Sequence, residues 1–391
     1  MSMIDKAALK EKYDYLVVGA GLYGSVMARE LTDRGCSVLV IEKRGQIAGN
    51  CYTEKTDGIC VHKYGPHIFH TDNEEVWKYV NRFAQFNDFV NRPVTVSGGR
   101  LYPLPFNMDT FFRLWGISDP DDAREKIRKQ AEEALKGKTP ENLEEQAISM
   151  AGTDIYEKLI KGYSEKQWGR DCRELPASII KRLRISFDHN SDYFGDRYQG
   201  IPDEGYTAMT ENILRGIKVI TGIDYDSPEI RMQTENIADV VIYTGSIDRY
   251  YAYRLGRLKY RSIRFDEITL DGVQDFQGRA VINYAEKSVP YTRITEHKHF
   301  DTKNNKTDAK FTIISKEFPE DHNDSNEPMY PVCDGENLRL YMRYRELADR
   351  DPGLHFGGRL GTYRYLDMDD VIASALADSS MLIERHESHT R

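Results

Sequence analysis

One segment near the start of the chain, residues 13–42, constrains the fold more than any other. An apolar run ends at Val18, and Gly19, Gly21 and Gly24 follow it in the spacing G-x-G-x-x-G. An amphipathic stretch and a second apolar run, which ends at Glu42, complete the segment. In a dinucleotide-binding βαβ unit the first glycine permits a tight turn, the second admits a pyrophosphate and the third lets helix and strand pack. The segment therefore predicts a parallel sheet with a dinucleotide at its edge.

The acid at the end of the second run narrows the choice of dinucleotide. Glu42 lies 18 residues after Gly24, where a carboxylate accepts hydrogen bonds from ribose hydroxyls and repels a 2′-phosphate. NADP is therefore disfavoured, although Lys43 and Arg44 follow. These residues alone leave NAD, FAD and a glycine loop without a ligand as alternatives.

Composition limits the partners and the compartment. The net charge of -9 disfavours nucleic acid, so a phosphate ligand has to meet a local group of cations. We find no apolar run long enough to span a membrane and no secretory signal at the start, so we expect no membrane span. The five cysteines form no C-x-x-C pair, which favours a reducing cytoplasm over a disulfide framework or a zinc site.

Three histidines offer a possible metal site. His62, His67 and His70 are separated by five and three residues, but a Gly65-Pro66 turn lies between the first two and no matching carboxylates lie nearby. We therefore predict no metal, and expect the turn to bring main chain close to a flat ring.

The rest of the chain predicts an insertion into the nucleotide-binding part. Helices are expected to begin at Asp119-Pro120 and at Thr139-Pro140, and apolar residues recur at helical spacing from Leu143 to Leu159. Residues 186–335 are rich in β-branched and aromatic runs, as in antiparallel sheets. Strands at 218–220, 239–245 and 354–356 are expected to return to the nucleotide-binding part. Asp367 is expected to cap a helix whose amino end favours a cofactor as large as FAD.

Five longer strings resemble one family, the bacterial UDP-galactopyranose mutases, and the resemblance extends over roughly residues 13–377. They are Gly65–Thr71, Lys161–Gly169, Asp196–Pro202, Val289–His297 and Arg359–Asp367. The resemblance implies a multi-part α/β (α+β) fold: a Rossmann-like FAD-binding domain, an inserted helical bundle with a mobile lid, and a twisted antiparallel sheet. We place the FAD-binding domain at 1–90, 207–247 and 335–391, the helical domain at 105–185, and the sheet domain at 91–104, 186–206 and 248–334. A homodimer is also implied.

The resemblance also implies site residues. The catalytic residues are expected to be Arg182, Arg293 and His70. Substrate contacts are expected from Tyr163, Trp168, Arg182, Tyr193, Phe194, Asn283, Arg293, Tyr330 and Tyr365. Cofactor contacts are expected from Gly19, Gly21, Gly24, Glu42, Lys43, Asn50, Val219, Gly245, Arg359, Asp367 and Met368. The chain departs from the family at Ala48, where glycine is usual, and at Met329, where tyrosine is common.

The implied activity interconverts UDP-galactopyranose and UDP-galactofuranose, with FAD active when reduced and N5 of the flavin as the covalent catalyst. Its product supplies galactofuranose for cell-surface polysaccharides. A UDP-N-acetylgalactosamine mutase, a flavin oxidoreductase of the amine oxidase type and a non-catalytic sugar-nucleotide binding protein are the alternatives.

Overall fold

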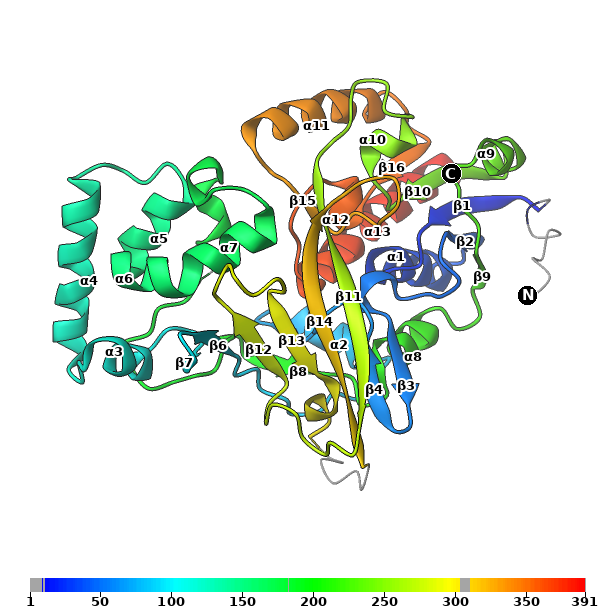
Figure 1. The fold of residues 1–391 in the computed structure, drawn as a ribbon. Coiled ribbons are helices and arrows are strands. Elements are labelled where there is room, and N and C mark those ends of the chain that lie inside the picture. Colours follow the sequence, from blue (N-terminus) through cyan, green and yellow to red (C-terminus); the bar gives the residue numbers. More distant parts are fainter. Residues whose placement is uncertain (1–8, 10, 182, 303–309, 391) are drawn as a thin grey trace.

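Three groups of elements lie side by side along the molecule. A parallel sheet with its helices forms one end, a larger sheet lies in the middle, and a group of helices forms the other end (Figure 1). The structure is a computed structural model and describes residues 9, 11–181, 183–302 and 310–390.

The parallel sheet has five strands in the order β16-β10-β1-β2-β9. They are β1 (Tyr13–Val18), β2 (Val38–Glu42), β9 (Lys218–Thr221), β10 (Ala238–Tyr243) and β16 (Leu354–Phe356). The three strands that the sequence predicted to return from later in the chain therefore lie beside the first two. Helix α1 (Leu22–Asp33) leads from β1 to β2 on one side, while β10 lies on the other side. Strand order thus reverses at β1, and its carboxyl end is the expected ligand site.

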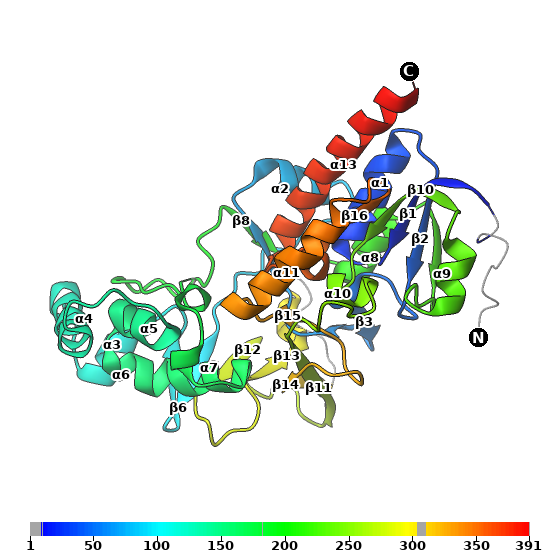
Figure 2. The same cartoon turned by 90° about the horizontal axis from the view of Figure 1, so that it is seen from above.

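Helices cover both faces of this sheet, because successive side chains of a strand point to opposite faces. Val17 of β1 packs in a core with α1, α2 (Glu74–Val80), α8 (Gly205–Ile213) and α13 (Met368–Thr390). Its neighbour Leu16 packs in a second core with α9 (Pro228–Thr234), α10 (Ile247–Tyr250) and α11 (Gly335–Ala348). Helix α13 runs beside α1 (Figure 2).

The larger sheet has seven strands in the order β15-β11-β14-β13-β12-β6-β7. They are β6 (Val94–Ser97), β7 (Arg100–Pro103), β11 (Tyr260–Asp271), β12 (Val281–Tyr284), β13 (Arg293–Glu296), β14 (Phe311–Asp321) and β15 (Tyr330–Pro331). Its pairings are antiparallel except that β6 and β12 run parallel, which we did not predict. The two strands meet after the helical insertion has carried the chain away and back.

Two small antiparallel pairs accompany these sheets. They are β3 (Thr53–Thr56) with β4 (Ile59–His62), and β5 (Phe69–Thr71) with β8 (Tyr198–Gly200). The second pair joins a strand from the predicted sheet domain to one from the predicted FAD-binding domain. The domain boundaries given above stay a prediction.

The helical group follows the predicted periodicity but is broken into short pieces. It contains α3 (Met108–Trp115), α4 (Pro120–Leu135), α5 (Leu143–Ala151), α6 (Thr153–Ile155), a π-helical turn (Tyr156–Ile160), α7 (Lys161–Trp168) and 3₁₀ turns at Cys172–Glu174 and Ala177–Ile179. The predicted start of α4 is confirmed, since the Asp119 side chain accepts hydrogen bonds from two main-chain N–H groups of its first turn. The start predicted at Thr139-Pro140 is wrong. Asn142 caps α5 instead, because its side chain accepts a hydrogen bond from Glu145 N in the first turn of the helix.

Candidate functional site

A cavity of about 260 Å³ opens at the carboxyl ends of the parallel strands. Its lining includes these residues of the predicted cofactor set: Gly19, Gly21, Gly24, Glu42, Lys43, Asn50, Gly245, Arg359 and Met368. The strands around β1 bring them together, since parallel strands present their carboxyl ends at one edge. The amino ends of α1 and α13 also reach this cavity, and helix amino ends favour anionic groups.

The three glycines of the turn are glycine for different reasons. A Cβ added to Gly24 would overlap Gly19 O, and one added to Gly19, at φ +108°, would overlap Thr244 Oγ1. A Cβ added to Gly21 would come no closer than 3.8 Å to another part of the protein, at Gly49 Cα. Packing within the chain thus demands the first and third glycines, while the second keeps open a space at the cavity. That open space fits the pyrophosphate of a dinucleotide.

Main-chain hydrogen bonds hold the carboxylate of Glu42 in the cavity wall. One oxygen accepts from Ala20 N at 2.7 Å and the other from Arg44 N at 2.8 Å, and the residue is buried. Carboxylate oxygens have further lone pairs, so these bonds orient the group without preventing it from accepting from a ribose. The geometry fits the predicted role.

Two further predicted cofactor residues already have partners in the protein. Lys43 Nζ donates to Glu327 Oε1 at 2.8 Å, and Asn50 Oδ1 accepts from Arg44 Nη2 at 3.0 Å. Both residues line the cavity. A ligand there would therefore share or replace these contacts.

The loop beside the glycine turn holds an unfavourable residue. Ala48 has φ 71° and ψ -1°, in the left-handed region that favours glycine. Its N–H donates to Ala20 O at 2.8 Å, which fixes the loop against the glycine turn. The departure from the family's glycine thus costs backbone strain.

Two predicted cofactor residues do not line this cavity, and their assignment stays a prediction. Val219 lies within β9 and packs against the core, and Asp367 lies just before α13. Lining residues that we did not predict follow the carboxyl end of β9, namely Ile223, Asp224, Tyr225 and Asp226. The rule that ligands bind at the carboxyl ends of parallel strands could have identified them.

A second cavity, of about 470 Å³, lies between the helical group and the larger sheet. Its lining includes these residues of the predicted substrate set: Tyr163, Trp168, Tyr193, Asn283, Arg293, Tyr330 and Tyr365. They come from α7, β12, β13, β15 and two connections. Part of the wall is apolar, including Leu104, Phe106, Leu159, Ile160, Ile179, Ile180 and Leu183. Among the described residues, the cavity thus offers one cation, Arg293, and several phenol hydroxyls beside an apolar surface.

The cation, Arg293, is paired with a buried carboxylate. Its Nε lies 3.1 Å from Glu317 Oε2, close enough for an ion pair but without hydrogen-bond geometry. Burial raises the pKa of Glu317, and Arg293 opposes that shift. Burial lowers the pKa of Arg293, but Glu317 and nearby tyrosines outweigh it, so the net pKa is raised. The guanidinium is therefore charged and held in place by Glu317.

The phenols around Arg293 are neutral. Burial raises the pKa of Tyr193 to about 12, and it also raises the pKa of Tyr163 and Tyr330. Neutral phenols can donate hydrogen bonds to phosphate oxygens. The set is suited to an anion that needs both charge and donors.

Arg359 connects the two cavities. It lines the first cavity, and its guanidinium carbon lies 5.4 Å from the ring centroid of Tyr330 and 5.1 Å from that of Tyr365. The two rings stack at 5.4 Å and line the second cavity. Arg359 Nη2 also donates to Leu366 O at 2.7 Å. The cavities therefore share a wall, so a ligand in one would lie close to a ligand in the other.

His70 and Phe194 form a pair that lines neither cavity directly. Their rings stack with centroids 3.7 Å apart, and His70 Nδ1 lies 3.0 Å from Asp196 Oδ2. Phe194 meets the cavity residue Tyr193 edge to face at 5.0 Å. Their catalytic and substrate roles stay predictions.

His67, which we did not assign to the site, lines the cofactor cavity instead. Its Nδ1 lies 2.8 Å from Gly65 O, and burial lowers its pKa to about 4, so the imidazole is neutral. Its main-chain N–H donates to Nδ1 of the buried His62 at 3.2 Å. The expected approach of the Gly65-Pro66 turn to a flat ring could have pointed to His67.

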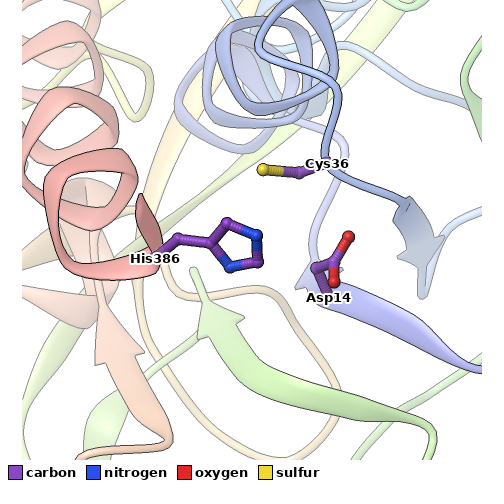
Figure 3. Close-up of side chains that lie close together, drawn as sticks. All are labelled: Asp14, Cys36 and His386. Carbon is purple, nitrogen blue, oxygen red and sulfur yellow. The ribbon is translucent and has the colours of Figure 1, made fainter. Parts of the chain in front are cut away.

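Two groups of possible metal ligands lie elsewhere in the part of the chain that the structure describes: one is Asp275, Glu296 and His299, and the other comes from three separate elements. Asp14, Cys36 and His386 point toward one another from β1, from the loop before β2 and from α13 (Figure 3). Asp14 Oδ2 already accepts from Ser37 N at 2.6 Å and from Ser37 Oγ at 2.7 Å. None of the three residues lines either cavity, and we assign them no part in the site.

Arg182, predicted to close over the diphosphate, lies outside the described residues, and its role stays a prediction. Its neighbours Ile180 and Leu183 line the second cavity. Among the described residues, no helix combines the length and apolar character that a membrane crossing needs.

Comparisons with known proteins identify the family of the chain. The family model for UDP-galactopyranose mutase matches residues 158–365, and that for an NAD(P)-binding Rossmann-like domain matches residues 17–83. The chain is 40% identical over 371 residues to a probable UDP-galactopyranose mutase of Klebsiella pneumoniae, covering 92% of each chain. It is 35% identical over 378 residues to a dTDP-fucopyranose mutase of Escherichia coli, covering 95% of this chain and 99% of that one.

A crystal structure of reduced UDP-galactopyranose mutase has the same fold, with a TM-score of 0.75 at 16% identity over 95% of this chain and 96% of that chain. The fold is thus a mixed α/β fold with a Rossmann-like domain, as predicted. The chain belongs to the UDP-galactopyranose mutase family, a family of isomerases.

Proposed function

We propose that this protein binds FAD in the first cavity and a UDP-linked galactose in the second, and interconverts the pyranose and furanose forms of the sugar. The observation that carries the proposal is the wall shared by the two cavities, made by Arg359, Tyr330 and Tyr365. It would place a sugar in the second cavity beside a flavin in the first.

When bound and reduced, FAD supplies a nucleophile, N5, for the anomeric carbon of the sugar. The residues of the chain would do the remaining work by binding and orientation. Arg293, with the neutral phenols of Tyr163, Tyr193 and Tyr330 and the hydroxyl of Tyr365, would hold the diphosphate and stabilise the negative charge on UDP as it departs. The same contacts would keep UDP in place for its return.

The remaining predicted residues would complete the substrate site. Trp168 and the apolar wall would contact the nucleoside, and Asn283 would contribute a polar group from β12. Arg182 would close over the diphosphate, and His70 with Phe194 would support the Tyr193 side of the cavity. We further propose a cytoplasmic homodimer whose product supplies galactofuranose for cell-surface polysaccharides, as the family resemblance implies.

The test is to incubate dithionite-reduced protein with UDP-galactofuranose and to identify the product by chromatography. We expect UDP-galactopyranose, formed without stoichiometric consumption of reductant, and no turnover by the oxidised protein. Stoichiometric oxidation of a substrate by O₂ would favour an amine oxidase type of activity instead. UDP binding without any turnover would favour a non-catalytic binding protein.

A second candidate is suggested by the relative from Escherichia coli, a dTDP-fucopyranose mutase. The same shared wall would serve dTDP-fucopyranose, because the diphosphate contacts would be the same. Parallel assays with the UDP-galactose, UDP-N-acetylgalactosamine and dTDP-fucose forms, compared by kcat/KM, decide among these substrates.

A further inference from the structure

Helix α7 lies beside the connection between β12 and β13 (Figure 1). One face of the helix lines the cavity with Tyr163, Ser164, Gln167 and Trp168. On the opposite face, Gly162 and Lys166 meet the main chain of residues 284–291, and Glu165 meets the side chain of Lys287. The position of this second face therefore determines where the cavity face lies.

Gly162 allows helix and connection to approach closely. A Cβ at this position would overlap Ala285 O and would lie 3.1 Å from Lys287 N. Any larger residue would push the helix away from the connection. Glycine is unfavourable inside a helix, so the close approach accounts for its presence here.

Lys166, one turn later, fastens the contact. Its ammonium donates to Tyr284 O at 2.8 Å, to Val289 O at 3.0 Å and to Tyr291 O at 2.9 Å. An ammonium has three N–H donors, so these three carbonyls satisfy all of them. At the edge of the contact, Lys287 Nζ and Glu165 Oε2 form an ion pair at 2.9 Å.

The surroundings of Lys166 indicate that it fixes the position of α7 against residues 284–291 rather than simply stabilising the fold. Its hydrogen-bond partners among the described residues are carbonyl oxygens, and burial lowers its pKa to about 8, with Glu286 opposing that shift. A half-buried cation held only by carbonyls is costly to desolvate. The three carbonyls, however, lie on the segment that joins Asn283 on β12 to Arg293 on β13, and both of these line the substrate cavity.

We propose that Lys166, aided by Gly162, is a positioning residue that fixes the wall made by Tyr163 and Trp168 relative to the wall made by Asn283 and Arg293. This inference rests on the proposed function for what the cavity binds. The geometric part, the fastening of α7 to residues 284–291, stands on the contacts above.

The test compares Lys166→Met and Gly162→Ala with the wild-type FAD-bound protein. Lys161→Met is the matched control, because Lys161 lies on the same helix and its ammonium, among the described residues, contacts Glu157, at 3.1 Å, and the ring of Tyr156. For Lys166→Met we expect UDP to bind about tenfold more weakly and KM to rise about tenfold, while kcat falls less than about threefold. Gly162→Ala should act in the same direction, and the control should match the wild type with unchanged FAD content.

Hydrogen exchange followed by mass spectrometry measures the fastening without any substrate. In Lys166→Met, segments 161–168 and 284–291 should exchange faster together, while α5 keeps its wild-type protection. Wild-type binding of UDP by Lys166→Met, or unchanged exchange in those two segments, would overturn the inference. A wild-type protein that binds no UDP would instead count against the proposed function, and the exchange result would still decide the fastening.

Discussion

The two cavities are built from different kinds of chemistry. The cofactor cavity lies at the edge of one parallel sheet, where a glycine turn, the Ala48 loop and two helix amino ends meet. The substrate cavity is walled by side chains that distant segments bring together, and Arg293, the predicted cation among its described lining residues, is paired with the buried Glu317. Substitutions should therefore affect the first cavity through backbone space and conformation, and the second through charge and hydrogen bonding.

The largest effect is expected at Arg293. Replacing it with lysine keeps the charge but loses the planar fork of donors, and alanine loses both, so kcat/KM should fall about tenfold to a hundredfold or more, on the order of 1.5–3 kcal/mol. Steady-state assays with UDP-galactofuranose measure this fall in kcat/KM. Because alanine also leaves the buried Glu317 without its cationic partner, the double variant Arg293→Ala/Glu317→Gln is the control for folding. Wild-type kcat/KM in both single variants would place the diphosphate elsewhere.

The glycine turn offers the matching test in the cofactor cavity. Gly24→Ala would force a methyl group onto Gly19 O and should destabilise the protein by about 1–3 kcal/mol. Gly21→Ala meets no such overlap, so the flavin-free protein should unfold like the wild type while FAD binds at least about tenfold more weakly. Urea denaturation and flavin titration measure the two effects. Equal loss of stability in both variants would contradict the division of roles among the glycines.

These expectations show what the sequence could and could not predict. The glycine turn, Glu42 and the strands around them were predicted because the constraint is local and repeats a known geometry. The parallel pairing of β6 with β12 and the ion pair of Arg293 with Glu317 depend on distant segments, and nothing in the local pattern indicates them. The start of α5 at Asn142, in contrast, has a local signal, because Glu145 follows the capping Asn142 by three residues. The residues expected to bind substrate were predicted only because longer strings resemble a family, and their roles stay a prediction. The resemblance did not explain why Gly162 and Lys166 stand in one of those strings.

A pH series measures the effect of the buried Glu317 charge in the substrate cavity separately from the other effects of losing Arg293. In Arg293→Ala, Glu317 loses the group that opposes the rise of its pKa, so its folded pKa climbs further above the unfolded value. A carboxyl whose folded pKa is raised contributes its full stability to the folded state below its unfolded pKa, near 4.3. That stability is lost as the pH rises toward the folded pKa. Relative to Arg293→Ala/Glu317→Gln, the single variant should lose about 1–2 kcal/mol of unfolding free energy between pH 5 and pH 8. Parallel pH curves in urea denaturation would show that Glu317 carries no charge penalty.

The smallest effect is expected where the chain departs from the family in the cofactor cavity. Ala48 is held in the left-handed region at a cost of roughly 1–2 kcal/mol, whereas glycine would lose roughly 0.5–1 kcal/mol through its greater freedom in the unfolded chain. Ala48→Gly should therefore stabilise the protein by about 0.5–1 kcal/mol, measured by urea denaturation with and without FAD. Ala20→Gly is the matched control, because Ala20 is buried beside the same loop and has no positive φ. It should destabilise by a similar amount, since it gains freedom in the unfolded chain and relieves no strain. A loss of stability in both variants would mean that the hydrogen bond from Ala48 N to Ala20 O, rather than the left-handed conformation, decides the stability of this loop.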